Sequence, residues 1–400
     1  SGSKNATLPI LAASILANQV KLKNIPLVKD IFTMVELLTF IGLKAKIFKN
    51  KNIIEINNKD EKINTLAPYK LVKTMRAGVL VLGSLLTRYG KAKVSLPGGC
   101  AIGTRPVDLH LFALKKLGAK IKIKNGYIIA EAKNGLKGTL IKFPNISVGA
   151  TENALLAASK AKGKTVLKNC AIEPEIRDLI LFLNKLGVKI KIAGRTITIN
   201  GSNKKSRLVN HSIIPDRIEL GTYMIAGALS GKNITINKIN PSIVKNETDI
   251  LRKMGVKIKK KKNSIIIEKN NKLKKINITT KPYPGFPTDL QAQLMVLMTQ
   301  ANGLSQIKEN IFENRFMHVP ELKRMGAKIK IKNKTAFIEG PTKLTGAEVM
   351  ATDLRASVSL VLAGLIAENR TIINRIYHLD RGYEFLETKL KNCKAEIKRI

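Results

Sequence analysis

The sequence lacks tryptophan and is poor in the residues that build redox, metal and stacking sites. It has 3 cysteines, 4 histidines and an aromatic content of 4%. Cys100, Cys170 and Cys393 are too few and too widely spaced for a disulfide framework or a zinc site. The histidines show no ligand spacing either, so we expect no metal and no other cofactor. This cysteine usage is typical of a reducing compartment, and we expect the protein to be cytoplasmic.

Long apolar runs are also missing. The most apolar stretches, residues 77–86 and 354–366, are short or interrupted by polar residues, so they predict buried helices rather than membrane spans. The opening Ser-Gly-Ser-Lys has no apolar segment of the kind found in secretory signals. We therefore expect no membrane partner.

Acidic residues are scarce beside basic ones, 28 against 71, which gives a formal net charge of +43. Such a balance can indicate nucleic-acid binding. The lysines, however, alternate with isoleucine in segments such as residues 121–124 and 329–332, where every second side chain of a strand would face outward. Few aromatic rings are present for base stacking. We therefore expect anionic small-molecule substrates and no specific nucleic-acid partner.

The sequence contains an internal repeat that recurs along its whole length. A phrase built on Gly-x-Lys recurs with its glycine at Gly42, Gly118, Gly187, Gly255 and Gly326. A sixth copy has Lys394 in place of the glycine. The intervals are 76, 69, 68, 71 and 68 residues. This spacing predicts one structural unit of about 70 residues, repeated six times.

Each unit has the same predicted order of elements. An Ala- and Leu-rich helix is followed by a strand, an amphipathic helix that ends at the repeated glycine, and two alternating strands such as Lys120–Lys124 and Tyr127–Glu131. With a strand ahead of the first helix, the unit reads βαβαββ. Six units favour an α/β protein of two domains with three units each, residues 4–213 and 214–400. The predicted first helices are Leu8–Leu16, Met75–Leu86, Asn153–Ala161, Ile218–Leu229, Leu290–Gln300 and Leu354–Ala367.

The starts of these first helices carry charged residues at equivalent places, namely Lys4, Arg76, Asp289 and Arg355. Asn, Thr and Asp side chains at the openings of the first helices, among them Asn5 and Thr151, are candidate N-caps. Because the free N–H groups of a helix start attract anions, three such ends in each domain would form a cationic cleft. Each charge alone is compatible with an ordinary solvated first turn, but their recurrence favours a functional site.

One loop stands apart from the repeat, Ser95-Leu-Pro-Gly-Gly-Cys100-Ala-Ile-Gly-Thr-Arg105-Pro-Val-Asp-Leu109. Its glycines allow a close approach to a ligand. Arg105 would favour the thiolate of Cys100 and could bind a phosphate or carboxylate through two N–H groups. The alternative is a surface turn in which the cysteine is incidental.

Together these motifs resemble the UDP-N-acetylglucosamine 1-carboxyvinyltransferase family within the EPSP synthase superfamily. The resemblance runs in order from Lys4 to the C-terminus, and its motifs are long and numerous. It implies a two-domain inside-out α/β barrel, in agreement with the six repeats. Besides the Cys100 loop, the matching segments are residues 1–6, 71–77, 147–151, 173–176, 215–219, 286–293, 313–321, 351–357 and 377–384.

The resemblance also implies a reaction. Phosphoenolpyruvate and UDP-N-acetylglucosamine would give the 3-O-enolpyruvyl sugar nucleotide and phosphate by addition and elimination, in peptidoglycan precursor synthesis. Asp289 would be the base for the sugar 3-hydroxyl, and we expect a closed, dry surrounding to raise the pKa of its carboxyl group. Cys100 would be the acid, would form a covalent adduct with phosphoenolpyruvate, and would be the thiol that fosfomycin alkylates. Lys4 completes the implied catalytic set.

The implied binding residues form two groups. Phosphoenolpyruvate would contact Lys4, Asn5, Arg105, Arg315, Arg355 and Arg381. UDP-N-acetylglucosamine would contact Arg76, Arg105, Pro106, Val107, Asp108, Leu109, Asn145, Ile146, Ser147, Val148, Asp289 and Ile311, with Asn5 beside them. The sequence does not fix the oligomeric state.

The sequence departs from the family pattern in a few places. Family members carry a strand ahead of the Ser-Gly-x-Lys-Asn segment that this sequence does not include, so we expect one sheet with an unpaired edge. Lys394 must adopt another geometry or a left-handed conformation. Asn145 stands where relatives often have a base. We expect Cys170 and Cys393 to be core thiols and Asp353 to be a helix cap.

Two other functions are compatible with the sequence. The sister enzyme 5-enolpyruvylshikimate-3-phosphate synthase shares the fold and phosphoenolpyruvate, but its members lack the Pro-Gly-Gly-Cys loop. An inactive, lysine-rich binding protein on the same scaffold is the second alternative. Phosphate release in the presence of both substrates would distinguish the transferase from the binding protein.

Overall fold

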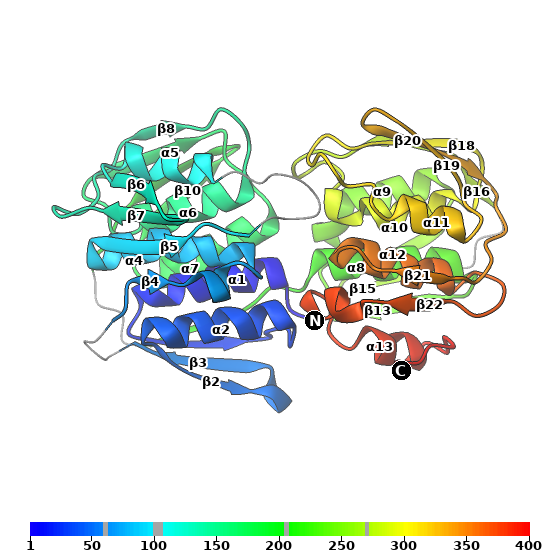
Figure 1. The fold of residues 1–400 in the computed structure, drawn as a ribbon, viewed down its shortest axis with the longest axis horizontal. Coiled ribbons are helices and arrows are strands. Elements are labelled where there is room, and N and C mark those ends of the chain that lie inside the picture. The colour runs from blue at the N-terminus through cyan, green and yellow to red at the C-terminus, as the bar shows by residue number, and fades with distance from the viewer. Residues whose placement is uncertain (59–62, 99–106, 204–207, 269–271) are drawn as a thin grey trace. The chain divides into compact units, whose positions relative to one another are not determined.

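The computed structural model describes residues 1–400 except 59–62, 99–106, 204–207 and 269–271, and all statements below concern the described residues. Two compact units divide the chain, the first ending at Ile214 and the second beginning at Pro215 (Figure 1). Cys100, Arg105 and Pro106 lie outside the described residues. Among the helices described, none is long and apolar enough to cross a bilayer.

The first unit alternates helices with short strands. In chain order its elements are α1 (Lys4–Ala13), η1 (Ser14–Leu16), β1 (Gln19–Lys23), α2 (Lys29–Ile41), β2 (Lys44–Phe48), η2 (Lys49–Lys51), β3 (Ile53–Asn57), β4 (Leu66–Ala67), α3 (Tyr69–Val72), η3 (Arg76–Leu80), α4 (Val81–Tyr89), β5 (Lys91–Ser95), α5 (Asp108–Lys116), β6 (Lys120–Lys124), β7 (Tyr127–Glu131), β8 (Leu140–Lys142), α6 (Val148–Ala158), β9 (Lys164–Lys168), α7 (Pro174–Lys185), β10 (Lys189–Ala193), β11 (Thr196–Asn200) and β12 (Val209–Ser212).

The second unit repeats this alternation. Its elements are α8 (Arg217–Ser230), β13 (Ile234–Asn237), η4 (Pro241–Val244), α9 (Lys245–Lys253), β14 (Ile258–Lys261), β15 (Ser264–Ile267), β16 (Leu273–Lys274), β17 (Asn277–Thr279), η5 (Thr288–Leu290), α10 (Gln291–Met298), β18 (Ala301–Lys308), α11 (Val319–Arg324), β19 (Lys328–Lys332), β20 (Thr335–Gly340), β21 (Glu348–Met350), α12 (Leu354–Gly364), β22 (Ile372–Asn374), η6 (Ile376–Arg381) and α13 (Leu386–Asn392).

The sheets of the first unit share one topology. In each, the strand that follows a first helix pairs in parallel with one strand and antiparallel with a hairpin, as β9 does with β8 and with β11. The order β8-α6-β9-α7-β10-β11 is the predicted βαβαββ repeat. In the first repeat the parallel neighbour of β1 is β12, which comes later in the chain.

The sheets of the second unit vary more. The strand β18 has two parallel neighbours, β16 and β17, and the antiparallel hairpin β19–β20. The strand β13 pairs with β15 alone, and the last sheet consists of the parallel pair β21–β22. Within the described residues, β22 therefore has one strand neighbour where β1, β5, β9 and β18 have at least two.

The first helices form the interior of each unit, and the sheets lie outside them. All eight residues of α10 are buried, as are nine of the ten residues of α1. A helix that is buried on every side belongs to a core. In the first unit α4 packs against α6 and α1 packs against α7, while in the second unit α10 packs against α12 and α8. Figure 1 shows the β2–β3 hairpin on the outer side of α2.

The repeated glycine ends the second helix of a unit, as the sequence predicts. Gly42 has φ 116°, and Gly118, Gly187, Gly255 and Gly326 have φ between 88° and 96°. A left-handed residue at this place lets its N–H bond back to the last helical turn. Lys394 adopts the same conformation with φ 65°, so the sixth copy keeps the turn despite its Cβ atom.

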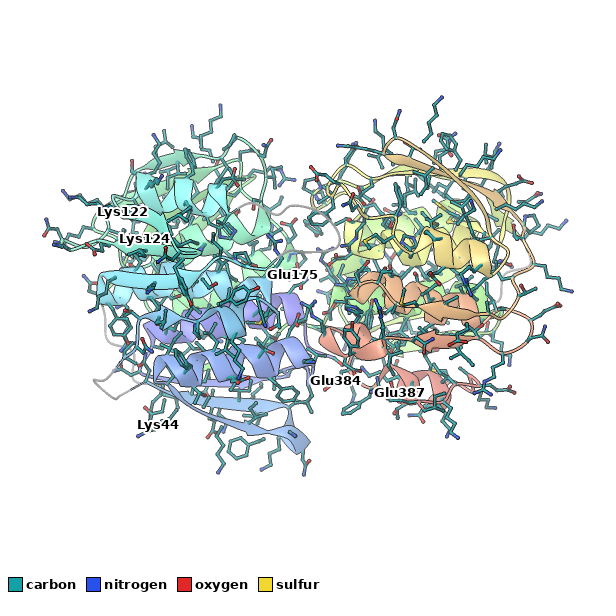
Figure 2. The ribbon with its side chains drawn as sticks, in the orientation of Figure 1. Lys44, Lys122, Lys124, Glu175, Glu384 and Glu387 are labelled. Atoms are coloured by element: carbon teal, nitrogen blue, oxygen red, sulfur yellow. The ribbon has the colours of Figure 1, made fainter. Side chains whose placement is uncertain are left out.

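The alternating lysines lie on strands at the edges of sheets. Each of these sheets has an edge strand that is also the outer strand of a hairpin, and these edge strands are β2, β6, β10, β14 and β19. Figure 2 shows Lys44 of β2, together with Lys122 and Lys124 of β6, pointing away from the ribbon. Lysine on an edge strand discourages pairing with another chain. Much of the excess positive charge is therefore spread over sheet edges.

Candidate active site

Lys4 is the first residue of α1 and is largely buried. The Ser3 hydroxyl caps this helix by accepting a hydrogen bond from the Ala6 N–H at 3.3 Å. The Lys4 ammonium donates to Asp30 Oδ2 at 3.1 Å, and Asp30 lies in the first turn of α2. Asn5 follows Lys4 and is partly exposed. The capping residue is thus Ser3 and not the Asn that the sequence analysis had considered.

Arg76 begins the second repeat, on a short 3-10 turn that precedes α4 rather than on one continuous helix as predicted. Beside it lies His110 of α5, whose pKa is lowered to about 4 by burial and by the Arg76 charge. The Asn153 Nδ2 atom lies 3.1 Å from His110 Nδ1, and Asn153 Oδ1 accepts from the Gly83 N–H at 2.8 Å. A neutral imidazole and an amide therefore connect α5, α6 and α4 behind Arg76.

The expected sugar-nucleotide residues 145–148 form the start of α6. Ser147 is the N-cap, and its hydroxyl accepts from the Ala150 N–H at 3.3 Å. Asn145 and Val148 are exposed, whereas Ile146 and Ser147 are partly buried. Thr151, which the sequence suggested as a cap, instead donates its hydroxyl to the Ser147 carbonyl at 2.7 Å.

The start of α5 holds the described end of the Cys100 loop. Asp108 is exposed and lies in the first turn of α5, and Val107 and Leu109 on either side of it are partly buried. Exposed backbone at a helix start is suited to contacts with a polar ligand. Asp108 is thus open to solvent, and Val107 and Leu109 are open in part.

The second unit brings three of the predicted residues into direct contact. Asp289 of η5 accepts from Arg315 Nη2 through Oδ1 and from Arg355 Nη2 through Oδ2, both at 2.8 Å. The Asp289 side chain is 28% exposed, while those of Arg315 and Arg355 are 4% and 7% exposed. Two guanidinium partners favour an ionised carboxylate. The sequence predicts a closed, dry surrounding that raises the pKa of the Asp289 carboxyl group, and the two arginines act in the opposite direction.

Arg355 is held from its other side by a buried polar network. Its Nη1 donates to the Tyr383 hydroxyl at 3.2 Å, and that oxygen lies 2.9 Å from Thr222 Oγ1. Gln293 Nε2 donates to the Tyr383 hydroxyl at 3.2 Å and to the Asp289 carbonyl at 3.0 Å. Burial works against the charge on Arg355, but Asp289 and Tyr383 outweigh it, so the pKa of this guanidinium is raised.

The remaining predicted residues of the second unit lie on loops and short turns. Ile311 is 36% exposed. Arg381 is the last residue of η6 and is partly exposed. Asp353 caps α12 by accepting from the N–H groups of Arg355 and Ala356, which confirms its prediction as a cap.

The two described cysteines differ from each other. Cys170 is fully buried, and burial raises the pKa of its thiol to about 12, as expected of a core residue. Cys393 is exposed, so its prediction as a core thiol is wrong. It stands at the C-terminal end of α13.

Sequence reasoning missed the residues that support the charged ones. His110, Asn153, Thr222, Gln293 and Tyr383 received no role. Gln293 and Tyr383 belong to motifs that carry the family resemblance, and their buried polar groups could have indicated a hydrogen-bond network. Among the described residues, no group of three or more His, Cys, Asp or Glu side chains is arranged to hold a metal ion.

Comparison with known proteins gives consistent relatives along the whole chain. A family model described as EPSP synthase (3-phosphoshikimate 1-carboxyvinyltransferase) matches residues 1–390. The chain is 61% identical to the UDP-N-acetylglucosamine 1-carboxyvinyltransferase of Pelagibacter ubique, covering 100% of this chain and 95% of that protein. It is 52% identical to the Rickettsia bellii protein of the same name, with 96% of that protein covered.

Solved structures agree on the fold. The enolpyruvyl transferase NikO from Streptomyces tendae superposes with a TM-score of 0.89 at 25% identity, covering 100% of this chain and 94% of that one. The EPSP synthase of Acinetobacter baumannii superposes with a TM-score of 0.75 at 18% identity, which speaks for the fold alone. It covers 98% of this chain and 94% of that one. The fold is that of the enolpyruvyl transferases, an α/β protein of two inside-out barrels with six repeats.

Proposed function

Because the chain belongs to the UDP-N-acetylglucosamine 1-carboxyvinyltransferase family, we propose that it transfers the enolpyruvyl group of phosphoenolpyruvate to the 3-hydroxyl of UDP-N-acetylglucosamine, with release of phosphate. This is the reaction that begins peptidoglycan precursor synthesis. We also propose a cytoplasmic location, because the cysteine usage of the sequence is typical of a reducing compartment.

One structural observation carries the proposal. Asp289 stands at the start of a first helix with its two carboxylate oxygens bonded to Arg315 and Arg355. The arginines fix the direction of the carboxylate and keep it ionised, which is the state a base needs. They also place positive charge where an anionic substrate would bind, and preorganised charges of this kind stabilise developing negative charge.

The addition step uses Asp289 as the base. The sugar 3-hydroxyl loses its proton to the Asp289 carboxylate, and its oxygen bonds to C2 of phosphoenolpyruvate. The methylene carbon C3 takes a proton from an acid, which we assign to the Cys100 thiol, and the product is a tetrahedral ketal. In the elimination step the Cys100 thiolate takes a proton back from C3, and the C2–O bond to phosphate breaks. Phosphate leaves with the proton that Asp289 had taken, and the enolpyruvyl sugar nucleotide forms.

The cations of the two units would bind the substrates. Lys4, Arg105 and Arg381 would hold the phosphate and carboxylate of phosphoenolpyruvate, with Asn5, Arg315 and Arg355 beside them. The sugar nucleotide would lie against Arg76, residues 105–109, residues 145–148, Asp289 and Ile311. Support comes from the exposure of Asp108 and Val148 at the starts of α5 and α6, from the exposure of Asn145 ahead of α6, and from the partial exposure of Arg76.

Phosphate release tests the proposed function. The protein is mixed with phosphoenolpyruvate and UDP-N-acetylglucosamine, and inorganic phosphate is followed with and without fosfomycin. We expect release that needs both substrates and that fosfomycin abolishes. Release that requires shikimate 3-phosphate in place of the sugar nucleotide would identify the sister activity. No release from a well-folded protein would contradict the proposal.

A matched pair of cysteine variants tests the role of Cys100. Cys100→Ser should lose fosfomycin sensitivity and most of its turnover, because a hydroxyl is a far weaker acid than a thiol near neutral pH. The control is Cys393→Ser, which changes an exposed thiol at the far end of α13. Full activity and fosfomycin sensitivity in Cys100→Ser would rule out the assigned role.

A further inference from the structure

We propose that Glu309 is a positioning residue for the base, because its carboxylate joins the loop that carries Arg315 to the helix start that carries Asp289. The inference rests on the proposed function in one respect, since it takes Asp289 to be the base. Glu309 follows β18 directly and is 1% exposed.

One oxygen of Glu309 fixes the course of the chain after β18. Its Oε1 accepts hydrogen bonds from the N–H groups of Ile311 at 2.7 Å and Phe312 at 3.1 Å. Together these two bonds hold the backbone in a tight turn around the carboxylate. The turn begins the loop that leads to Arg315, so its geometry determines where that loop starts.

Two threonines bring further segments to the same carboxylate. Thr280, which follows β17, donates its hydroxyl to Oε1 at 2.9 Å and accepts from the Asn310 N–H at 3.0 Å. Thr288, the first residue of η5, donates its hydroxyl to Oε2 at 2.9 Å. Thr288 immediately precedes Asp289. The single side chain of Glu309 therefore joins the ends of β17 and β18 to the start of η5.

The ion pair between Asp289 and Arg315 does not by itself hold in place the backbone of the two segments that carry these residues. Asp289 and Arg315 contact each other through side-chain atoms, so their ion pair directs the carboxylate but does not bind the backbone segments that carry the two residues. The bonds of Glu309 instead act on the backbone segments from which the two side chains extend. A base must lie within hydrogen-bond reach of its proton, and a displacement of about 1 Å can lower a rate about 100-fold.

A carboxylate suits this task better than an amide. Burying a charged group is costly unless it is fully hydrogen-bonded, and Glu309 has four donors in bonds of 2.7–3.1 Å. Charge-assisted bonds are roughly twice as strong as neutral ones. A turn needed only for stability would not require this charge. The geometry of the base provides a reason for it.

The first test compares the two threonines whose hydroxyls donate to Glu309, of which Thr280 also accepts from the Asn310 N–H and so loses one bond more on substitution. Thr288→Val removes the bond that reaches the segment of Asp289, and Thr280→Val removes the bond that reaches β17. Both hydroxyls donate to Glu309 at 2.9 Å. We expect Thr288→Val to lower kcat about 10-fold or more with little change in KM, and Thr280→Val to stay within about threefold of wild type. Equal losses of kcat in the two variants would overturn the proposal.

The second test asks whether Glu309 acts through Asp289. Glu309→Ala should lower kcat about 10- to 100-fold in the wild-type background, but by less than about threefold in an Asp289→Asn background, because the base is already lost. Glu309→Gln should recover part of the rate, since its amide oxygen still accepts from the turn and its amide nitrogen can donate to Thr288. Equal losses in both backgrounds would mean that Glu309 only stabilises the fold.

The wild-type rate separates this inference from the proposed function. If the wild-type protein releases phosphate and the variants fail as described, only the role of Glu309 is refuted. If it releases none, the proposed function fails. The coupling between Glu309 and Asp289 is then tested by the Tm of the wild type, Glu309→Ala, Asp289→Asn and the double variant. Losses of Tm that do not add would support this coupling, and additive losses would refute it.

Discussion

The helix starts of the two units are built alike but hold charge differently. In the first unit Lys4, at the start of α1, bonds to Asp30 in the first turn of α2 at 3.1 Å. In the second unit Arg217, at the start of α8, faces Glu247 in the first turn of α9 at 3.6 Å. This cation–acid pair is thus a feature of the repeat. Asp289 breaks the pattern, because an acid occupies the start of η5 and binds two arginines.

This difference distinguishes charged pairs that stabilise the fold from charged residues that take part in the proposed reaction. A pair that recurs in corresponding repeats has a structural explanation in both. At Asp289 the order is reversed, because the acid lies at the start of the first helix and its partners are two arginines. This reversal coincides with the residue that resembles the catalytic base of the family. The comparison can be tested by substitutions that separate stability from turnover.

The largest effect is expected from Asp289→Asn. The variant loses the proposed base and leaves two guanidiniums beside a neutral amide, so we expect kcat to fall about 100- to 10,000-fold. Phosphate release under saturating substrates measures this loss. Asp353→Asn is the matched control, because asparagine caps a helix as well as aspartate does, and it should remain within about threefold of wild type. Similar losses in both variants would remove the distinction between base and cap.

The second-largest effect is expected from substitutions of Lys4 and Arg217, which should differ in their effect on substrate binding. Lys4→Met and Arg217→Met each leave a buried acid without its cation, and each should lower the free energy of unfolding by about 3 kcal/mol. Only Lys4→Met should also raise the KM for phosphoenolpyruvate. The double variant Lys4→Met with Asp30→Asn should regain stability without regaining activity. Recovery of full activity in that variant would make Lys4 a purely structural residue.

Acid stability provides a prediction that applies to both units. Burial lowers the pKa of His110 in the first unit, and that of His318 in the second, from 6.5 to about 4. Between these values the unfolded chain binds protons that the folded chain does not, so stability falls as the pH drops from 6.5 to 4. The free energy of unfolding falls by about 3 kcal/mol for each histidine over this range.

Substitution checks this acid effect. His110→Gln and His318→Gln should each reduce the pH dependence of unfolding in urea by about one proton between pH 4 and 6.5. Above pH 7 neither variant should change the slope. A slope that stays the same in both variants would contradict the assignment of buried neutral imidazoles.

The smallest effect on stability is expected at the edge lysines. Lys122→Gln with Lys124→Gln removes two charges from the edge strand β6, and Lys115→Gln with Lys116→Gln removes two from the exposed face of α5. Both pairs should unfold within about 0.5 kcal/mol of wild type. Only the β6 variant should aggregate faster on concentration, as measured by light scattering. Equal aggregation would mean that net charge alone keeps the protein dispersed.

Local patterns made much of the fold predictable. The hairpin strands β6 and β7 have the predicted bounds, because alternation and an Asn-Gly turn are encoded in adjacent residues. The left-handed residue at Gly42 and its equivalents also follows from a short phrase. Helix starts were less predictable, since Ser3 and Ser147 cap where Asn5 and Thr151 were also plausible.

Distant contacts explain what the sequence did not reveal. Thr222 and Tyr383 are 161 residues apart, yet their hydroxyl oxygens lie 2.9 Å from each other behind Arg355. No periodicity relates such positions. Cys393 was expected in the core because it lies outside any loop like that of Cys100, but its thiol is exposed at the end of α13. The charged residues of the site were suggested by motifs, whereas their supports required the fold.

The pairing of β12 with β1 has a consequence for the order in which the chain folds. Val20 aligns with Val209, and the Asn24 side chain donates to the Ile213 carbonyl at 2.8 Å. During synthesis from the N-terminus, the first sheet cannot be completed until residues 209–213 have left the ribosome. The hairpin β2–β3 and helix α1 must therefore wait with one edge of β1 exposed. The first unit closes as a whole, after its three repeats have been made.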